Sequence, residues 1–216
     1  MPRPNRVDPW GDMHASPARG LFTGNRGCLV DDDRQTVRHH RGTLWIICRT
    51  EFRGWKHPLD APRRWTPLFF LDDAVALAAG HRPCALCRRD DYLAYRSAVT
   101  TGARLASVVS AVDLNRRLSR ERLRRGGGLH RAGDRILWEA PLEELPPGTV
   151  IIGGHDRSPH LVTPDGLRPF GFGGWGEPVR SSTRLVDVLT PPTSVLALGH
   201  GFTPVLHPSA VIPSLR

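Results

Sequence analysis

The chain has 216 residues, of which 39% are hydrophobic and 24% are charged, and this balance excludes a wholly disordered protein. Thirty basic residues against 21 acidic ones give a formal net charge of +9. That charge favours a polyanionic partner, with nucleic acid as the first candidate and a solvated basic surface as the alternative. No apolar stretch approaches the roughly 20 residues that cross a bilayer, and the N-terminus lacks the apolar core of a signal peptide, so a cytoplasmic protein with no membrane partner is expected.

The first part of the chain is expected to form short strands and a short helix. Residues 1–20 are rich in proline, glycine and charge, which predicts an irregular arm. The apolar run GTLWIICRTEF over residues 42–52 predicts a buried strand, and a second strand is expected at 68–71. Asp72 is a good N-cap for a helix over 74–79, because its carboxylate can accept a hydrogen bond from the first turn.

Two further helices are expected before a run of three glycines. Gly80 ends the first helix, and the segment 88–99 begins another, with two aspartates in the first turn, where the helix dipole favours anions. Apolar residues at three- and four-residue steps predict an amphipathic helix over 105–125, and its second half is rich in arginine. Glycines 126–128 end that helix and mark the expected domain boundary.

The rest of the chain is expected to be rich in short strands. Runs of β-forming residues alternate with Pro-Gly, Gly-Gly and Asp-Gly steps, which is typical of a small barrel or a meander, and a short helix is expected to begin at Pro191. The predicted fold class is therefore α+β. The expected units are the arm at 1–20, a first module at 21–104, a basic helix with its glycine linker at 105–128, and a β-rich domain at 129–216.

Two of the four cysteines form a Cys-x-x-Cys step at Cys84 and Cys87. A redox pair would need a strand before the motif and a helix beginning at it, and a disulfide would need an export signal, so a metal knuckle is favoured. Zn²⁺ takes four soft or borderline ligands, and this spacing lets one turn supply two thiolates. Cys48, at the end of a predicted strand, is expected as the third ligand. The fourth is expected to be Cys28, with the alternatives His39, His40 and His81.

A longer pattern surrounds these cysteines. A Cys-Arg follows an apolar strand, and a Phe-rich strand, an alanine-rich helix and a Gly-x-Arg-Pro-Cys-x-x-Cys knuckle come after it. The residues are Cys48, Arg49, Phe69, Phe70, 74–79, Gly80, Arg82, Pro83, Cys84 and Cys87. From about residue 42 to 89 the chain resembles the N-terminal zinc domain of the Ada family of DNA alkylation-repair proteins, which makes 21–104 an Ada-like zinc-binding module.

The resemblance implies a role for Cys48 beyond metal binding. In the Ada family the zinc cysteine after the strand is also the nucleophile, and it accepts a methyl group from a DNA phosphotriester. The family has a second cysteine four residues later, and that position is Phe52 here. The four-ligand set of the family is therefore not reproduced by matching positions alone.

Clustered arginines are expected to bind the phosphates of nucleic acid, because guanidinium groups hold phosphate bidentately, although a solvated helical face is the alternative for those of 105–125. The expected positions are Arg49, Arg82, Arg88, Arg89, Arg116, Arg117, Arg120 and Arg124. The sequence thus predicts a zinc-binding, nucleic-acid-binding protein that acts in DNA repair or damage response. Two alternatives stay open: an alkyl acceptor that uses Cys48 as its catalytic thiolate, and a structural zinc protein with a protein partner.

Overall fold

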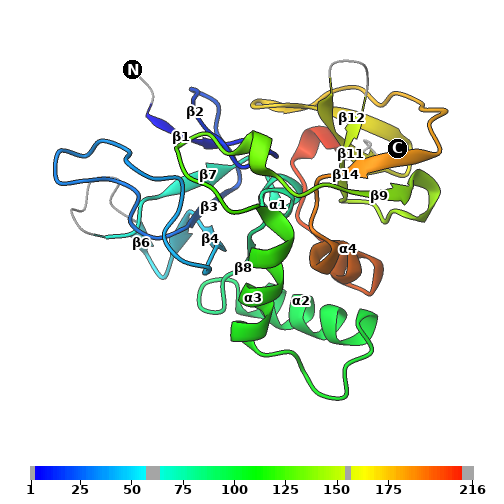
Figure 1. The fold of residues 1–216 in the computed structure, drawn as a ribbon, viewed down its shortest axis with the longest axis horizontal. Helices are drawn as coiled ribbons and strands as arrows, with labels where there is room; N and C mark the ends of the chain where they lie inside the picture. Colours follow the sequence, from blue (N-terminus) through cyan, green and yellow to red (C-terminus); the bar gives the residue numbers. More distant parts are fainter. Residues whose placement is uncertain (1–2, 57–63, 154–156, 211–216) are drawn as a thin grey trace.

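The computed structural model describes residues 3–56, 64–153 and 157–210. Figure 1 shows two sheets on either side of the short helix α1 (Asp73–Ala78), with helices α2, α3 and α4 gathered below them. The α+β class expected from the sequence is confirmed. None of the helices in these three ranges is both long and apolar enough to cross a membrane.

The first sheet is mixed and has six strands in the order β2-β1-β7-β3-β4-β8. Strand β1 pairs in parallel with β7, and β4 pairs in parallel with β8, whereas the other pairs are antiparallel. The strands are β1 (Pro4–Val7), β2 (Met13–Ala15), β3 (Phe22–Asn25), β4 (Ile46–Arg49), β7 (Leu68–Phe70) and β8 (Arg82–Pro83). Beside them, β5 (Glu51–Phe52) and β6 (Trp55–Lys56) form a two-stranded hairpin.

The first 20 residues depart from the irregular arm that their composition predicts. Strands β1 and β2 pair antiparallel, and Val7 and Met13 of these strands are buried. Gly11 has a φ of +92° and completes the reversal between the two strands, while Pro4 stands at the first position of β1. Prolines and glycines therefore mark the ends and the turn of a hairpin here, because proline is tolerated at a strand's first residue and glycine adopts positive φ without strain.

Helix α1 forms where the sequence predicts it. Asp72 is its N-cap, and one carboxylate oxygen of Asp72 accepts a hydrogen bond from the N–H of Val75 at 3.0 Å. Gly80, with a φ of +87°, follows its C-terminus. All six residues of the helix are buried, because the helix contacts both β7 and β10 (Val150–Gly153) and so lies between the two sheets.

The predicted helix over 105–125 is shorter than expected. After α2 (Arg89–Gly102), the helix α3 spans only Ala111–Arg122. Ser110 caps it, since its hydroxyl accepts a hydrogen bond from the N–H of Asp113 at 3.1 Å. Val109 is tied instead to α2 by hydrogen bonds with the side chains of two α2 residues, which holds the preceding segment outside the helix.

The second sheet is antiparallel throughout, in the order β13-β12-β11-β10-β14-β9, and it forms no closed barrel within the ranges described. Strands β10 to β13 follow one another as in the expected meander, whereas β14 lies between β10 and β9 and breaks that order. Its other strands are β9 (Trp138–Pro141), β11 (Ser158–Thr163), β12 (Gly166–Gly171), β13 (Gly174–Trp175) and β14 (Leu185–Val188). The helix α4 (Pro192–Gly199) follows, and three short 3-10 turns lie at Ala132–Asp134, Leu142–Glu144 and Pro208–Ala210.

The two sheets share one hydrophobic core. A single buried cluster joins residues of the first half, such as Leu77 and Tyr95, to residues of the second half, such as Val150 and Trp175. The indole N–H of Trp175 donates to the carboxylate of Asp72 at 2.7 Å, and so links β13 to the cap of α1. The glycines at 126–128 thus lie between the strands of the two sheets in the sequence, but the residues before and after them pack into the same hydrophobic core.

Candidate metal centre

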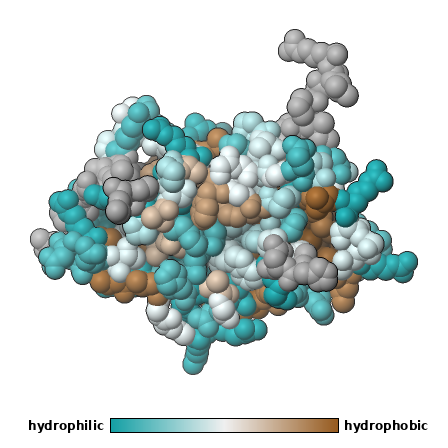
Figure 2. Space-filling view, turned by 90° about the horizontal axis from the view of Figure 1, so that it is seen from above, coloured by the Kyte–Doolittle hydropathy of each residue, from teal (hydrophilic) through white to brown (hydrophobic). Residues whose placement is uncertain are grey.

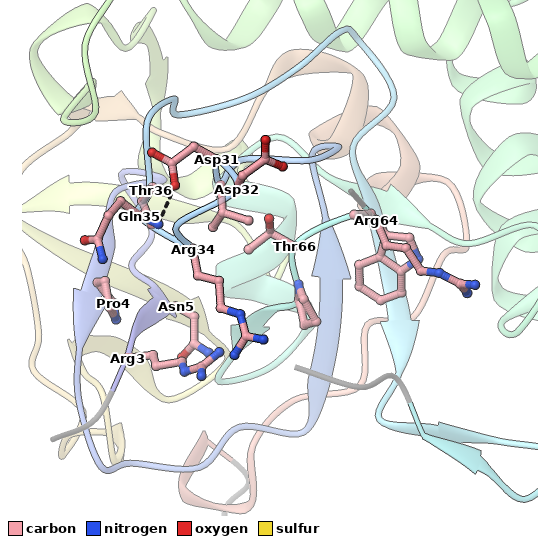
Figure 3. Close-up of a pocket in the computed structure, with 13 residues that line it drawn as sticks. Arg3, Pro4, Asn5, Asp31, Asp32, Arg34, Gln35, Thr36, Arg64 and Thr66 are labelled. Atoms are coloured by element: carbon pink, nitrogen blue, oxygen red, sulfur yellow. Dashed lines mark hydrogen bonds between the residues drawn. The ribbon is translucent and has the colours of Figure 1, made fainter. Parts of the chain in front are cut away.

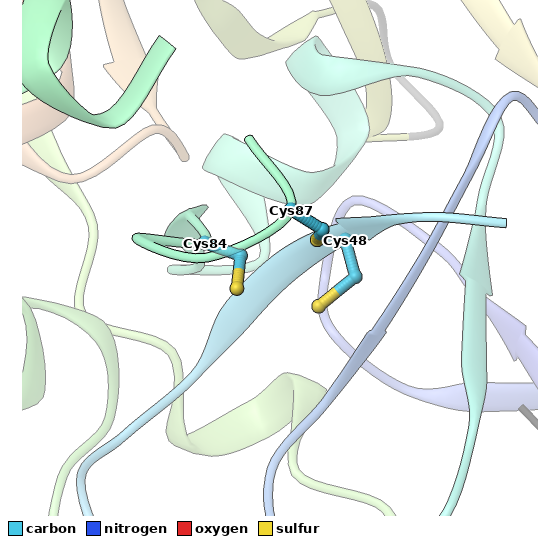
Figure 4. A group of neighbouring side chains, drawn as sticks. All are labelled: Cys48, Cys84 and Cys87. Carbon is cyan, nitrogen blue, oxygen red and sulfur yellow. The ribbon is translucent and has the colours of Figure 1, made fainter. Parts of the chain in front are cut away.

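Strand pairing brings the three predicted metal-binding thiols together. Parallel pairing of β4 with β8 places Ile47 opposite Pro83, so the next residues on the two strands, Cys48 and Cys84, lie side by side. The knuckle then returns Cys87 to the same place, as Figure 4 shows. The three Sγ atoms lie within 4.8 Å of one another, and all three side chains are buried.

Backbone N–H groups support the sulfur atoms. The N–H of Leu86 lies 3.4 Å from the Sγ of Cys84, and Cys84 also accepts from the backbone of Cys87. The N–H of Arg49 donates to the Sγ of Cys87. Hydrogen bonds of this kind stabilise thiolate over thiol, as they would in a knuckle that holds a cation.

The three thiols strongly perturb one another. Hydrogen bonds from the thiols of Cys48 and Cys87 lower the pKa of Cys84, so its proton leaves first. The same contacts with Cys84 and Cys87, followed by burial, raise the pKa of Cys48. Three thiolates this close repel each other, and a divalent cation among them removes that repulsion, because a coordinating thiol is deprotonated outright.

The donor set fits a soft or borderline divalent metal. Zn–S bonds of about 2.3 Å in a tetrahedron put sulfur atoms about 3.8 Å apart, which small side-chain rotations reach from the observed group of Cys48, Cys84 and Cys87. Hard cations such as Mg²⁺ and Ca²⁺ take oxygen ligands instead, and this group offers none. Three buried cysteines therefore form a site that could bind a metal such as zinc.

The structure does not bring the expected fourth ligand to this group. The Sγ of Cys28 is half-buried and lies 3.5 Å from the carbonyl oxygen of Val30, outside the cluster. Over residues 3–56, 64–153 and 157–210, only the three cysteines gather at the site, so the prediction of Cys28 is corrected. The prediction of Cys28 rested on the number of thiols in the chain. Cys28 lies just before the 30–36 loop and not on β4 or the knuckle, which keeps its Sγ away from the other three sulfur atoms.

None of the three alternative ligands joins the cysteine group, and a buried arginine contacts two of them. The buried guanidinium of Arg26 approaches the Nε2 atoms of His39 and His81 at 2.8 and 3.2 Å. Burial, followed by the charge of Arg26, lowers the pKa of His39 to about 2 and that of His81 well below its ordinary value. His40 packs against the ring of Trp45 instead. His39 and His81 are thus buried in the core and His40 is half-buried beside them, and none of the three is part of the metal site.

Hydrocarbon side chains cover the thiols. Ile46 and Phe52 are partly buried and pack against the three cysteines. Phe52 stands on the β5–β6 hairpin, whose turn residues Arg53 and Gly54 have φ values of 54° and 73°, as in a type I′ turn. Four residues after Cys48, this chain therefore places an aromatic ring against the sulfur cluster.

Two of the arginines expected to bind nucleic acid are internal. Arg82 is buried, and its Nε donates to the side chain of Asn115 on α3 at 3.0 Å. Arg88 is buried and forms a bidentate pair with Asp73, with one of its two hydrogen bonds at 2.8 Å, and its Nε donates to Asp91 at 2.8 Å. Both arginines hold the knuckle against its neighbouring helices, so the prediction of phosphate contacts is corrected for these two.

The other six expected arginines are accessible. Arg117 is half-buried, and five are exposed: Arg49, Arg89, Arg116, Arg120 and Arg124. Within the three described ranges, seven arginines but only three aspartates are buried, so an excess of four positive charges lies inside the protein. The surface is therefore less basic than the formal charge of +9 suggests.

Sequence reasoning missed the residues that position the knuckle. In the sequence Asp73 looks like an ordinary aspartate at the start of a helix. In the structure its carboxylate accepts hydrogen bonds from Arg88 and from the N–H of Val205, the latter at 2.9 Å. Arg122 is buried against the ring of Trp45, with its guanidinium carbon 3.7 Å from the ring centroid, and donates to the carbonyl oxygen of Gly80. Only one aspartate is needed to cap α1, and Asp72 does so. The second aspartate of the pair, Asp73, is therefore the local signal in the sequence that could have indicated a positioning role.

Comparison of this chain with protein-family models, with curated proteins and with solved structures finds no match in any of the three.

Proposed function

We propose that this protein binds Zn²⁺ through Cys48, Cys84 and Cys87 and binds nucleic acid with the arginines around that site, in DNA repair or damage response. The observation that carries the proposal is the meeting of three buried Sγ atoms within 4.8 Å. Zinc would hold β4, the knuckle and the start of α2 together, and would draw the three thiols into their deprotonated form.

Exposed arginines support the nucleic-acid part of the proposal. Arg49 directly follows one metal-binding cysteine, and Arg89 lies two residues after another. On α3, which Arg82 ties to the knuckle, Arg116 and Arg120 line a groove of about 550 Å³. Guanidinium groups beside a groove can follow a phosphate backbone and make binding strongly dependent on salt.

The face of the molecule seen from above is mostly polar (Figure 2). In Figure 2, which views the molecule from above, hydrophilic residues dominate and hydrophobic residues appear in small separate patches. Large stable protein interfaces have a continuous apolar centre. This upper face therefore offers no continuous apolar centre to a protein partner, whereas the knuckle and α3 lie on the lower side of Figure 1 and are not part of this view.

Alkyl transfer to Cys48 is the second candidate, and the three-thiolate composition of the site favours it. Zn²⁺ with three thiolates carries one net negative charge, which keeps a bound sulfur nucleophilic. The Sγ of Cys48 would form a bond to the methyl carbon of a phosphotriester, the C–O bond would break, and the phosphodiester would leave as an anion. The exposed Arg49 beside it would hold the neighbouring phosphate.

Metal analysis tests the site first. Wild-type protein purified without added metal is expected to hold about one zinc per chain, Cys84→Ser to lose it, and Cys28→Ser to keep it, since Cys28 lies outside the cluster. X-ray absorption at the zinc edge should show sulfur scatterers from all three cysteines. Well-folded wild-type protein without metal would refute the proposal.

Two further measurements separate the functions. A salt titration of binding to a DNA duplex should give a steep linear loss of affinity, which the double variant Arg116→Ala/Arg120→Ala makes shallower; an absent or flat response would favour a protein partner. Mass spectrometry after incubation with methylated DNA should show a methyl group on Cys48 if it is the acceptor. An unmodified protein that still binds DNA would remove only the alkyl-transfer candidate.

A further inference from the structure

A groove of about 590 Å³ lies on the second sheet. Its size is in the range of cavities that hold small ligands, about 300–1,000 Å³. The residues that line it come from β9, β10, β11, β12 and β14 and from the segment over 179–183, and none belongs to the cysteine cluster or to the groove on α3. It is therefore a separate place at which a ligand can bind.

A smaller pocket, of about 360 Å³ beside the loop over residues 30–36, has acidic groups that do not act together (Figure 3). The carboxylates of Asp31 and Asp32 point to opposite sides in Figure 3. One oxygen of Asp31 already accepts a hydrogen bond from the N–H of Gln35 at 2.8 Å. These two carboxylates do not converge on one ligand, so the groove on the second sheet carries the stronger argument.

Strand register places the floor of the groove on the face of the sheet that is turned away from α1. Residues paired across antiparallel strands point to the same face, so His160 lies beside Ile151, its partner on β10. Ile151 belongs to a small apolar cluster with Val186 and Leu167, whereas Val150, on the other face of β10, belongs to the shared core around α1. The floor is thus aliphatic, and His160 is a polar side chain on the same face.

His160 presents one unused hydrogen-bond acceptor to the groove. The side chain is only 8% exposed, and its Nδ1 lies 2.9 Å from the carbonyl oxygen of Ser158. Because a carbonyl oxygen can only accept, Nδ1 carries the hydrogen, and Nε2 of the neutral ring keeps a free lone pair. Nε2 has no hydrogen-bond partner within the described ranges, and it is not sealed inside the protein. The ring itself lines the groove, so a ligand there can reach Nε2.

A glycine on β10 makes room for the ring. A Cβ at Gly153 would lie 3.0 Å from the Nδ1 of His160, which is a tight contact. Without that side chain the ring can lie against β10 while Nδ1 donates to the backbone. Gly153 therefore helps to fix the position of Nε2.

The charged groups of the groove favour a neutral ligand. Glu139 and Arg180 are both exposed and have opposite signs, and Asp187 is paired with Arg157 at 3.2 Å. Among the described lining residues no excess of one charge selects an ion. An acceptor beside an aliphatic floor instead selects an apolar molecule with one strong O–H donor. A phenol meets both needs, because its ring is flat and apolar and its hydroxyl, with a pKa of about 10, is a strong neutral donor.

We propose that this groove binds a phenolic compound, with its ring against Ile151, Val186 and Leu167 and its hydroxyl donating to the Nε2 of His160. The site lies on the second sheet, and its ligand does not depend on the zinc or nucleic-acid functions proposed above.

Para-cresol and para-methylanisole are the matched probes, because the ether carries a methyl group where the phenol has its hydroxyl hydrogen. NMR titration of the wild-type protein should show para-cresol binding about tenfold more tightly than the ether, since only the phenol can donate to Nε2. The nitrogen-15 resonance of Nε2 in His160 should shift as para-cresol is added and should not shift with the ether.

The variant His160→Asn removes Nε2 and keeps a donor near the position of Nδ1, because the asparagine amide can still donate to the carbonyl of Ser158. His200→Asn is the matched control, since the Nδ1 of His200 also lies 2.9 Å from a carbonyl oxygen, that of Leu196, and His200 is outside the groove. The affinity for para-cresol should fall about tenfold in His160→Asn and stay unchanged in His200→Asn. Gly153→Ala, which keeps Nε2 but displaces the ring, should lower it as well.

The results either support or overturn the assignment. Equal affinity for the two probes, equal effects of the two histidine variants, or no binding of para-cresol by the wild-type protein would overturn it. If circular dichroism shows that His160→Asn does not fold, the wild-type protein still decides, because an Nε2 resonance that stays in place at saturation with para-cresol also overturns the assignment. Zinc content and duplex binding that persist in His160→Asn would show that this site is separate from those of the proposed function.

Discussion

The buried pair of Arg88 and Asp73 should link the stability of the fold to the metal site. The two side chains are 1% and 0% exposed, and the guanidinium makes two hydrogen bonds to the carboxylate. Two unit charges about 4 Å apart attract by about 4 kcal/mol at an effective dielectric constant of 20. Although burial lowers the pKa of Arg88, its hydrogen bond and charge contact with Asp73 outweigh burial and raise it.

Asp73→Asn is the perturbation that removes this pairing with the least change in shape. It keeps the volume and one oxygen that can accept from the N–H of Val205, but it leaves the charge of Arg88 paired only with the partly exposed Asp91. Breaking a buried pair in this way costs about 3–5 kcal/mol, which urea unfolding monitored by circular dichroism would measure. Asp113→Asn, which breaks the exposed pair with Arg116, is the matched control and should change stability far less.

Zinc affinity gives an independent readout of the same variant. Arg88 directly follows Cys87 and anchors the end of the knuckle, so Asp73→Asn should weaken zinc binding by about 10–100-fold, as loss of an outer partner does at other metal sites. If Asp73→Asn unfolds with the same midpoint as Asp113→Asn and holds zinc as tightly as wild type, the idea that this pair positions the knuckle is refuted.

Three further predictions concern the metal site and the N-terminal hairpin. Phe52→Cys should tighten zinc binding and add a sulfur scatterer at the zinc edge, because Phe52 already packs on the thiols; unchanged coordination would contradict this. Zinc should dissociate as pH falls, because protons compete for the thiolates, and a pH-independent metal content would refute thiolate ligation. Hydrogen bonding to Asp8 at 2.7 Å raises the pKa of His14. The stabilisation that this contact gives the folded protein should therefore be complete below the unfolded-state pKa of histidine, about 6.5, and should disappear as pH rises through the higher pKa of His14 in the folded state. NMR titration of His14 in wild type and in Asp8→Asn checks this, with equal pKa values contradicting it.

Local signals in the sequence determined the elements around the site. The N-cap at Asp72, the alanine-rich helix and Gly80 place α1 at Asp73–Ala78, and the Cys-x-x-Cys step that follows predicts a knuckle. Each of these signals involves groups within about one turn of one another, where hydrogen-bonding capacity and φ preference act independently of the rest of the fold. Strand β4 (Ile46–Arg49), which holds Cys48, was predictable for the same reason, from its compact apolar run.

Only the tertiary structure decided which distant residues meet. The parallel register of β4 with β8 brings Cys48 to Cys84, while Cys28 remains outside the cluster, although the sequence offers both Cys28 and Cys48 as partners of the knuckle. Burial also divides the arginines, since Arg88 faces a carboxylate inside the protein whereas Arg89, the next residue, faces solvent. Two neighbouring arginines thus have opposite roles, because strand pairing and helix packing decide whether each side chain points into the protein or toward solvent. These contacts join residues that are far apart in the chain, so they leave no local pattern in the sequence.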